Sequence, residues 1–250
     1  MSDKTALGDR MKFYESAFIN QRLMPQLPAF ARIDGKGFHN WTKGLERPYD
    51  KTFSQIMIDV TKMLVEDTQA VIGYTQSDEI TLSWYSEDFK SQIYFDGKIS
   101  KIISVVASMT TAYFNSLVAQ RLAYTNKEAA FFDCRVWNVP TLWEASNVFL
   151  WREQDATRNS IQMAARSVYS HKQCDNKNMN ELQEMLFQKN INWNNYPDSF
   201  KRGTYILNHR STTGSKIMLE GNLPVLSTIE NCPEVLYFGA EPKIKINPVK

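Results

Sequence analysis

The sequence is poor in cysteine and has none of the close cysteine spacings that hold metal ions. Its three cysteines, Cys134, Cys174 and Cys232, lie far apart and form no Cys-x-x-Cys motif. This usage is typical of reduced thiols, so we expect a cytoplasmic protein without a structural zinc site.

Long apolar runs are also missing from the sequence. By inspection, no stretch approaches the roughly 18 apolar residues that a membrane-spanning helix needs. The polar segment from Met1 to Lys12 lacks the apolar centre of a secretion signal. We therefore expect no membrane partner and no export.

Neither linkers nor a strong net charge mark the chain. No repeat, low-complexity segment or stretch rich in proline and glycine divides its 250 residues, so we expect a single domain over residues 1–250. The formal net charge is only +2, so any binding of nucleic acid must depend on local basic clusters. Hydrophobic residues make up 43% of the chain, which is enough for a sizeable core.

The apolar residues that are present predict an α+β fold. Strand-like runs occur at residues 28–35, 70–85 (a hairpin) and 131–139. Apolar residues at helical spacing predict amphipathic helices at residues 50–67 and 99–117. The resulting order, β-α-β-β-α-β, favours a single sheet covered by helices.

The C-terminal part continues with helices and one more hairpin. Helices are expected at residues 142–169 and 178–189, and the segments GTYIL and KIMLEG are expected to pair as a hairpin. We therefore expect a core over about residues 25–140 and a helical and hairpin extension over residues 141–250.

Three acidic residues stand where expected strands end or turn. Asp34 closes the first strand and is followed by Gly-Lys-Gly-Phe-His, while Asp78 and Glu79 lie at the turn of the hairpin. If these strands are neighbours, three carboxylates meet at one edge of the sheet, which is typical of a site for divalent cations. Two Mg²⁺ ions held there could stabilise the attacking and leaving oxygens of a phosphoryl transfer.

The same acids have a purely structural interpretation. Acidic residues are common in turns, and an aspartate often ends a strand. The upstream Asp-Gly pair in a β-α-β-β order supports the metal-binding hypothesis about as well as the structural one. The pattern alone leaves both open.

The segment after Asp34 could also contact phosphates. Gly35 and Gly37 allow the backbone to approach a ligand closely, and the amides between them could face phosphate oxygens. His39 could stack on a base, and Arg47 could reach the same phosphates. The spacing equally fits a common turn, a structural histidine and a solvated arginine.

Basic residues are scattered along the chain, with Trp151 and Trp193 among them. They are Lys98, Lys101, Arg152, Arg158, Arg166, His171, Lys172, Lys177, Lys201 and Arg202. Contact with an RNA backbone, with some stacking on bases, needs this composition. A solvated helix face around core tryptophans has the same composition, so the two interpretations stay open.

Taken in order, these motifs resemble the tRNA-histidine guanylyltransferase family, including its bacterial and archaeal Thg1-like branch. RIDGKGFH (residues 32–39) resembles the family's first metal and nucleotide motif, RPYD (residues 47–50) its basic-Pro-x-Asp step, and YTQSDEITL (residues 74–82) its second carboxylate motif. The segments DCRVW, WREQDATRNSIQ, YSHK and NINWNN follow in the family's order. The resemblance covers about residues 10–210.

The resemblance implies a palm-like catalytic core, shared with polymerases and nucleotide cyclases, and nucleotide addition in the 3′-to-5′ direction. In that reaction the 3′-hydroxyl of an incoming nucleoside triphosphate attacks an activated 5′ end of tRNA. A 5′-monophosphate end is first adenylylated, whereas a 5′-triphosphate end needs no such step. The implied partners are tRNA, GTP, ATP or other nucleoside triphosphates, and two Mg²⁺ ions.

The resemblance also implies site residues by matching position. Asp34, the main-chain carbonyl of Gly35 and Asp78 would hold the two Mg²⁺ ions, with Glu79 supporting them. The residues implied to contact the nucleotide are Gly35, Lys36, Gly37, Phe38, His39 and Ser77, with Arg47 in place of the family's phosphate-binding lysine. The residues implied in activation or tRNA contact are Lys98, Arg152, Asp155, Asn159 and Lys177.

One segment departs from the family pattern. Eukaryotic members carry His-Ile-Asn-Asn where this chain has Thr157-Arg158-Asn159-Ser160. The departure favours repair of tRNA 5′ ends against a template over strict addition of guanosine to histidine tRNA. The family tends to form tetramers, so we expect a homo-oligomer.

Two other functions remain as alternatives. The first is an ordinary palm enzyme, such as a nucleotide cyclase or a forward polymerase, with the same acids and a different acceptor. The second is a non-catalytic RNA-binding module. The intact acids argue against the second, because clustered carboxylates repel RNA.

Overall fold

The computed structural model describes residues 5–16, 19–122, 127–210, 216–221 and 223–245. The helices are α1 (Ala6–Ser16), α2 (Phe38–Trp41), α3 (Lys51–Thr68), α4 (Ile99–Arg121), α5 (Leu142–Val168), α6 (His171–Cys174), α7 (Met179–Phe187), α8 (Asp198–Arg202) and α9 (Cys232–Phe238). The strands are β1 (Ala29–Gly35), β2 (Ile72–Gln76), β3 (Glu79–Trp84), β4 (Phe132–Asn138), β5 (Thr204–Arg210) and β6 (Lys216–Gly221). The expected α+β class is confirmed.

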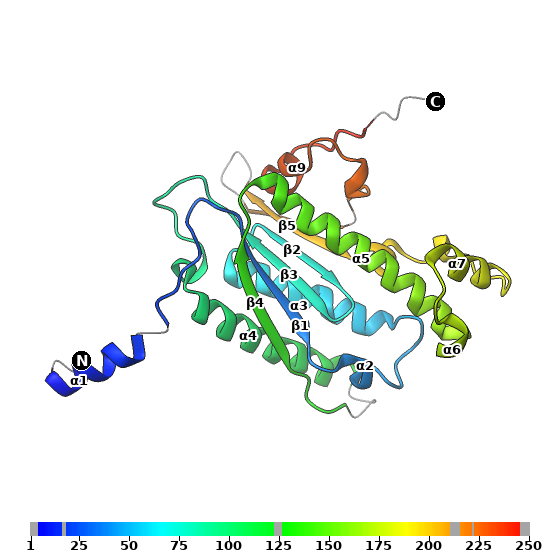
Figure 1. Cartoon of the computed structure of the whole chain (residues 1–250), viewed down its shortest axis with the longest axis horizontal. Helices are drawn as coiled ribbons and strands as arrows, with labels where there is room; N and C mark the ends of the chain where they lie inside the picture. The colour runs from blue at the N-terminus through cyan, green and yellow to red at the C-terminus, as the bar shows by residue number, and fades with distance from the viewer. Residues whose placement is uncertain (1–4, 17–18, 123–126, 211–215, 222, 246–250) are drawn as a thin grey trace.

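The described strands form one antiparallel sheet in the order β4-β1-β3-β2-β5-β6. The first four strands, with α3 and α4 between them, make the expected β-α-β-β-α-β unit. The C-terminal hairpin of β5 and β6 pairs with β2 and continues the same sheet (Figure 1). The sheet therefore runs without a break from the expected core into the expected extension.

Helices cover both faces of this sheet (Figure 1). Side chains alternate between the faces along a strand, so Ala29, Ala31 and Ile33 of β1 join the core cluster under α3 and α4. Phe30 points the other way and packs against Phe149 of α5, with ring centroids 5.6 Å apart. The sheet is thus the middle layer of three, while α1 projects away from this body (Figure 1).

Side-chain caps determine where α3 and α5 begin. The Asp50 carboxylate accepts a hydrogen bond from the Phe53 amide at 2.9 Å, and the Thr141 hydroxyl accepts one from Glu144 at 3.1 Å. Asp50 is the last residue of the RPYD segment. Its cap therefore also determines the place of Arg47, three residues before it.

The helix α4 corrects one expectation from the sequence. This helix has 23 residues, and a window of 18 of them has a mean hydropathy of 1.5, so it is long and apolar enough by length and composition to cross a membrane. In the fold, Ile102, Val106 and Phe114 of this helix are buried in the core beside α3 and β4. The apolar composition therefore has a structural use in the layer that covers the sheet.

Candidate active site

The acidic residues meet where β1 ends beside the turn between β2 and β3. In the antiparallel register, Asp34 lies directly opposite Glu79 of β3 and directly opposite Asp133 of β4. Residues so paired share a face of the sheet with Cβ atoms about 4.5–5.5 Å apart, and like charges there repel each other. With Asp78 in the turn, four carboxyl groups therefore gather at this end of the sheet.

The turn that holds Asp78 has only two residues, Ser77 and Asp78. Ser77 has a φ of 53°, in the left-handed region that two-residue hairpin turns require. A serine in that conformation is uncommon, and such residues concentrate at functional sites. The turn places the Asp78 carboxyl beside Asp34, as the sequence led us to expect.

The two glycines after Asp34 serve different needs. A Cβ atom on Gly35 would lie 2.3 Å from the ring of Phe38, so only glycine fits beneath that ring. Gly37 has a φ of 68° and precedes α2, so it turns the chain into the short helix. Phe38 itself is largely buried in an aromatic cluster with Trp41 and others.

The helix α5 presents a polar stripe to this end of the sheet. Arg152, Asp155, Asn159 and Arg166 recur at intervals of three, four and seven residues, which places them on one side of a helix. Asp155, Asn159 and Arg166 line the same cavity as the acids of the sheet. This spacing was visible in the sequence and could have predicted a single polar face.

Arg152 links that stripe to the sheet. Its guanidinium donates to a carboxylate oxygen of Glu79 at 2.8 Å and to one of Asp155 at 2.6 Å. The side chain is only 5% exposed, and the ring of Trp151 lies 3.9 Å from its guanidinium carbon. Arg152, for which the resemblance implied a role in activation or tRNA contact, is buried here and positions two carboxylates.

Glu79 differs from the expectation of three unpaired acids. Besides Arg152, it has Arg32 on the neighbouring strand, whose Nε lies 3.7 Å from the second Glu79 oxygen. By contrast, neither Asp34 nor Asp78 forms an ion pair with a residue that the structure describes. Asp34 and Asp78 therefore carry the negative charge of the site that no ion pair with a described residue neutralises.

Burial makes this charge costly. Desolvation, aided by the nearby Asp34 charge, raises the pKa of Asp78 from 3.8 to about 6. Desolvation also raises the pKa of Glu79, with the two arginines acting in the opposite direction. A cation at this point would offset the charge that burial makes unfavourable.

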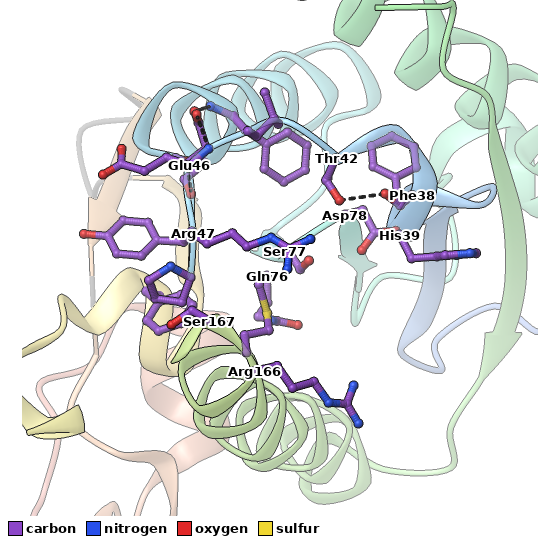
Figure 2. A pocket seen from close by; sticks show the side chains of 18 of the residues that line it. Phe38, His39, Thr42, Glu46, Arg47, Gln76, Ser77, Asp78, Arg166 and Ser167 are labelled. Atoms are coloured by element: carbon purple, nitrogen blue, oxygen red, sulfur yellow. Dashed lines mark hydrogen bonds between the residues drawn. The ribbon is translucent and has the colours of Figure 1, made fainter. Parts of the chain in front are cut away.

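Two cavities share the Ser77–Asp78 turn as their floor. The larger, of about 400 Å³, lies among α2, the segment before α3 and the C-terminal half of α5 (Figure 2). The smaller, of about 290 Å³, lies over Asp34 and Glu79 against the polar stripe. The residues that line both are Gln76, Ser77, Asp78, Met163 and Arg166.

Two arginines approach the larger cavity from different elements. Figure 2 shows Arg47 extending towards Ser77 from the segment before α3, while Arg166 lies on the α5 side. Neither guanidinium forms an ion pair within the described part of the chain, so both are available to an anion. His39 is exposed at the rim of the same cavity, and Lys36 is exposed in the loop beside it.

Two implied residues do not reach this site within the chain. Lys98 precedes α4 and forms a β-bridge with Arg22, at the end of α4 that lies away from the carboxylates. The 23 residues of α4 span about 35 Å at 1.5 Å per residue. Lys177 lines neither cavity and pairs instead with Glu181 at 3.1 Å.

Three further residues lie at or beside the site, Arg32, Asp133 and Arg166, and their sequence positions alone do not indicate this. Arg32 and Asp133 lie inside quoted motifs, but only the strand register shows that they face Glu79 and Asp34. Arg166 stood among the scattered basic residues, and only the helical spacing from Arg152 distinguishes it.

The donor set suits Mg²⁺ better than zinc. Among the described residues, no group of three or more His, Cys, Asp or Glu side chains could hold a metal ion. Mg²⁺ is usually bound through one or two carboxylates, with water and substrate phosphates completing its octahedron. Asp34 and Asp78, with the main-chain carbonyl of Gly35 between β1 and the loop, fit that requirement.

Comparison with known proteins agrees with this geometry. Residues 8–140 match the sequence profile of the family described as tRNAHis guanylyltransferase. A protein of Acanthamoeba polyphaga mimivirus is 32% identical over 223 residues, which are 80% of this chain and 76% of that protein. The tRNA(His) guanylyltransferase of Saccharomyces cerevisiae is 28% identical over 203 residues, 74% of this chain and 84% of its own.

Solved structures give the same answer over nearly the whole chain. A bacterial tRNA(His) guanylyltransferase (Thg1)-like protein in complex with ATP has a TM-score of 0.82 at 36% identity, covering 93% of this chain and 100% of that one. Such a protein in complex with GTP has a TM-score of 0.75 at 33% identity, covering 89% and 94%. This chain therefore belongs to the tRNA-histidine guanylyltransferase family and is a transferase enzyme.

Proposed function

We propose that this enzyme adds nucleotides to the 5′ end of tRNA in the 3′-to-5′ direction, using nucleoside triphosphates and two Mg²⁺ ions. The observation that carries the proposal is the position of Asp34 and Asp78, two acids without ion pairs among the described residues, beside two adjoining cavities. A reaction between a nucleoside triphosphate and a phosphorylated RNA end needs two binding sites that meet at the residues that hold the metal ions. The relatives in complex with ATP and GTP support these triphosphates as substrates.

The two cavities suggest a division of the substrates. We assign the triphosphate to the larger cavity, where Arg47 and Arg166 offer guanidinium groups that bind phosphate oxygens in forked geometry. We assign the activated 5′ end of the RNA to the smaller cavity, beside Asp155 and Asn159.

The acids of the site would hold the metal ions. Asp34, the Gly35 carbonyl and Asp78 would be the ligands, and two Mg²⁺ ions when bound would stabilise the attacking and leaving oxygens. Arg152 holds Glu79 opposite Asp34, so the ligand-bearing strand ends stay in register. The carboxylates would therefore be prearranged to hold the cations, and the cations would stabilise the negative charge that develops during the transfer.

We further infer a preference for repair of truncated tRNA. Where eukaryotic members carry an isoleucine, Arg158 is half exposed and pairs with Asp155 at 2.9 Å, next to the smaller cavity. A cation there replaces an apolar contact, so a pocket for one fixed guanosine addition is not retained. Pairing with the opposite strand of the acceptor stem can select the nucleotide instead.

The test compares two RNA substrates. We expect a higher kcat/KM for a 5′-truncated tRNA, labelled at its 5′ phosphate and offered each triphosphate in turn, than for intact histidine tRNA with GTP. Both are measured at one salt concentration, because affinity for RNA depends steeply on ionic strength. A preference for intact histidine tRNA, with guanosine added opposite adenosine, would contradict the repair assignment.

Two controls separate the alternatives. GTP alone should give no cyclic or dimeric product, which a nucleotide cyclase would make without RNA. An RNA-binding module would retain RNA affinity but incorporate no nucleotide under any condition. Either result would replace the proposed reaction.

We expect the active form to be a cytoplasmic homo-oligomer, with a tetramer as the expected size. Lys98 and Lys177 lie outside the active site of their own chain. In an oligomer, they could lie beside the active site of a neighbouring subunit. Light scattering at assay concentration measures the size, and mixing Lys98→Ala with Asp34→Asn subunits tests the exchange. Activity recovered in the mixture would support a site shared through Lys98, and no recovery would place Lys98 outside the active site.

A further inference from the structure

A third cavity, of about 460 Å³, lies at the opposite end of the sheet from the carboxylates. Trp84, at the end of β3 away from Glu79, and Asn208, in the far half of β5, belong to its wall. The end of α9 closes another side, well away from α2 in Figure 1. The volume is within the range of small-molecule sites, and neither of the catalytic cavities shares a residue with it.

Aromatic rings make up much of this wall. They belong to Trp84, Tyr85, Tyr94, Tyr237 and Phe238. The rings of Trp84 and Tyr94 are parallel within 5°, with centroids 6.4 Å apart, and Phe238 is 53% exposed. The indole of Trp84 donates to the carbonyl of Thr68, and the hydroxyl of Tyr237 bonds that of Ser83. Trp84 and Tyr237 are buried, so the ring surface open to a ligand belongs mainly to Tyr85, Tyr94 and Phe238.

Among the described residues that line the cavity, none is Asp, Glu, Lys or Arg. Three carry side-chain amides, Gln69, Gln92 and Asn208, and His209 contributes a ring whose Nε2 lies 2.8 Å from the carbonyl oxygen of Leu236. Asn208 is 9% exposed, and its Nδ2 donates to the carbonyl of Ala70 at 2.9 Å, which determines the orientation of the amide. The other amide atom, Oδ1, is buried without a hydrogen-bond partner in the described structure. A buried acceptor in this state is satisfied by a water molecule or by a ligand that donates.

We propose that this cavity binds an uncharged nucleobase, which stacks on the aromatic wall and donates an N–H group to Asn208 Oδ1. Aromatic side chains hold single bases by stacking, and asparagine and glutamine amides read their edges. Without Asp, Glu, Lys or Arg among its described lining residues, the cavity holds the base and leaves any phosphates in solvent. The base comes either from an unstacked RNA nucleotide or from a free nucleoside, and the proposal does not rest on the transfer reaction.

Adenosine is the probe for the cavity itself, measured by calorimetry on the full chain. We expect Phe238→Ala to raise the Kd of adenosine at least fivefold, because stacking contributes much of the affinity for a base. Phe238 is largely exposed, so its removal should leave the melting temperature unchanged. Phe187→Ala, an exposed phenylalanine that lines neither this cavity nor the catalytic ones, is the matched control and should leave this Kd unchanged, while His39→Ala reports any adenosine bound in the catalytic cavity. Purine riboside, which lacks the exocyclic amino group, should bind more weakly than adenosine if Asn208 Oδ1 accepts from that group.

A second arm identifies the source of the base. The Kd of a tRNA transcript is measured at fixed salt for the unaltered chain and for Phe238→Ala. A rise in this Kd assigns the cavity to an RNA base, whereas an unchanged value with weaker adenosine binding assigns it to a free nucleoside. If neither ligand loses affinity in Phe238→Ala, the proposal is wrong, whatever His39→Ala does.

Discussion

Asp34 lies between Glu79 and Asp133 on the neighbouring strands. Both of these acids pair with arginines, whereas Asp34 does not in the part of the chain that the structure describes. Glu79 has Arg152 and Arg32, and Asp133 has Arg135, whose Nε lies 3.6 Å from its carboxylate. Asp34 forms no ion pair within the described residues. At the scale of single residues, Asp34 is therefore the one acid in the row Glu79, Asp34 and Asp133 whose charge no ion pair in the described structure neutralises, and a bound cation would stabilise it most.

Replacing Asp34 should lower the activity without lowering the stability of the metal-free protein. We expect Asp34→Asn to lower kcat/KM for nucleotide addition by about a hundredfold or more, the effect of losing one preorganised electrostatic group. Without metal, the variant should be at least as stable as the unaltered chain, because repulsion from Glu79 and Asp133 falls. Incorporation of labelled nucleotide and thermal melting in EDTA measure the two effects. Asp88→Asn, on an exposed loop, is the control, and near-normal incorporation by Asp34→Asn would refute the assignment.

The next scale is that of elements, where Arg152 joins β3 to α5. Removing a partner from a buried ion pair costs about 3–5 kcal/mol, because the remaining charge stays buried. We expect this loss for Arg152→Met in urea unfolding, since Glu79 keeps only Arg32 at 3.7 Å and Asp155 keeps only the exposed Arg158. The double variant Arg152→Met/Glu79→Gln should recover part of it.

Arg158→Met is the matched control for that experiment. Arg158 also pairs with Asp155, but its side chain is 49% exposed, and exposed pairs contribute about 0–1 kcal/mol. Equal losses in Arg152→Met and Arg158→Met would mean that the buried pair does not hold β3 and α5 together.

The connection between β1 and α2 depends on the space above Gly35. In Gly35→Ala, the new Cβ would overlap the ring of Phe38, which cannot move freely inside its aromatic cluster. We expect a destabilisation of about 1–3 kcal/mol and a higher KM for the triphosphate, because the loop over the site must shift. Gly221→Ala, where a Cβ meets nothing within 4 Å, is the control. An unchanged KM would show that this loop does not contact the nucleotide.

Elements could be predicted from the sequence because their signals are local. Apolar spacing predicted α3 to within two residues at each end, and Asp50 supplied its cap. The register between strands is not local, so Asp133 could not be placed opposite Asp34 from spacing alone. The burial of Arg152 was missed for the same reason, because it depends on where α5 crosses β3.

For the whole molecule, the raised pKa of Asp78 predicts how stability varies with pH. The carboxyl titrates near 3.8 in the unfolded chain and near 6 in the metal-free fold, so its protonated form stabilises the fold at low pH. That contribution is lost as the pH rises through about 6. Asp78→Asn stays neutral, so its stability relative to the unaltered chain should grow between pH 4 and pH 7 and then level off. The full difference is at most about 3 kcal/mol for this shift.

Urea unfolding in EDTA at pH 4.5, 6 and 7.5 measures this difference. The control Asp88→Asn should show a constant difference from the unaltered chain across that range. With Mg²⁺ and a triphosphate present, the advantage of Asp78→Asn should disappear, because only the unaltered chain binds the ligands fully. An advantage of Asp78→Asn that does not change with pH would show that Asp78 is not desolvated in the fold.

The whole fold was predictable in its first half and less so in its second. The β-α-β-β-α-β order follows from the sequence, since each element has a clear period. The C-terminal hairpin was expected. The pairing of β5 with β2 was not, because the sequence of an edge strand does not indicate which strand pairs with it. Lys98 and Lys177 were implied at the site by resemblance, and the path of one chain does not take them there.

The polar stripe of α5 has a consequence for how the gene can change. From Arg152 to Arg166 the stripe runs about 21 Å along one unbroken helix, which sets the spacing of its side chains against the sheet. One inserted codon in this stretch would rotate everything beyond it by about 100° and turn Arg166 away from the cavity. Codons inserted in the exposed loop around Asp88 would not change the orientation of the α5 side chains. Among natural relatives, length should therefore vary in that loop while the stretch from Arg152 to Arg166 keeps a constant number of residues.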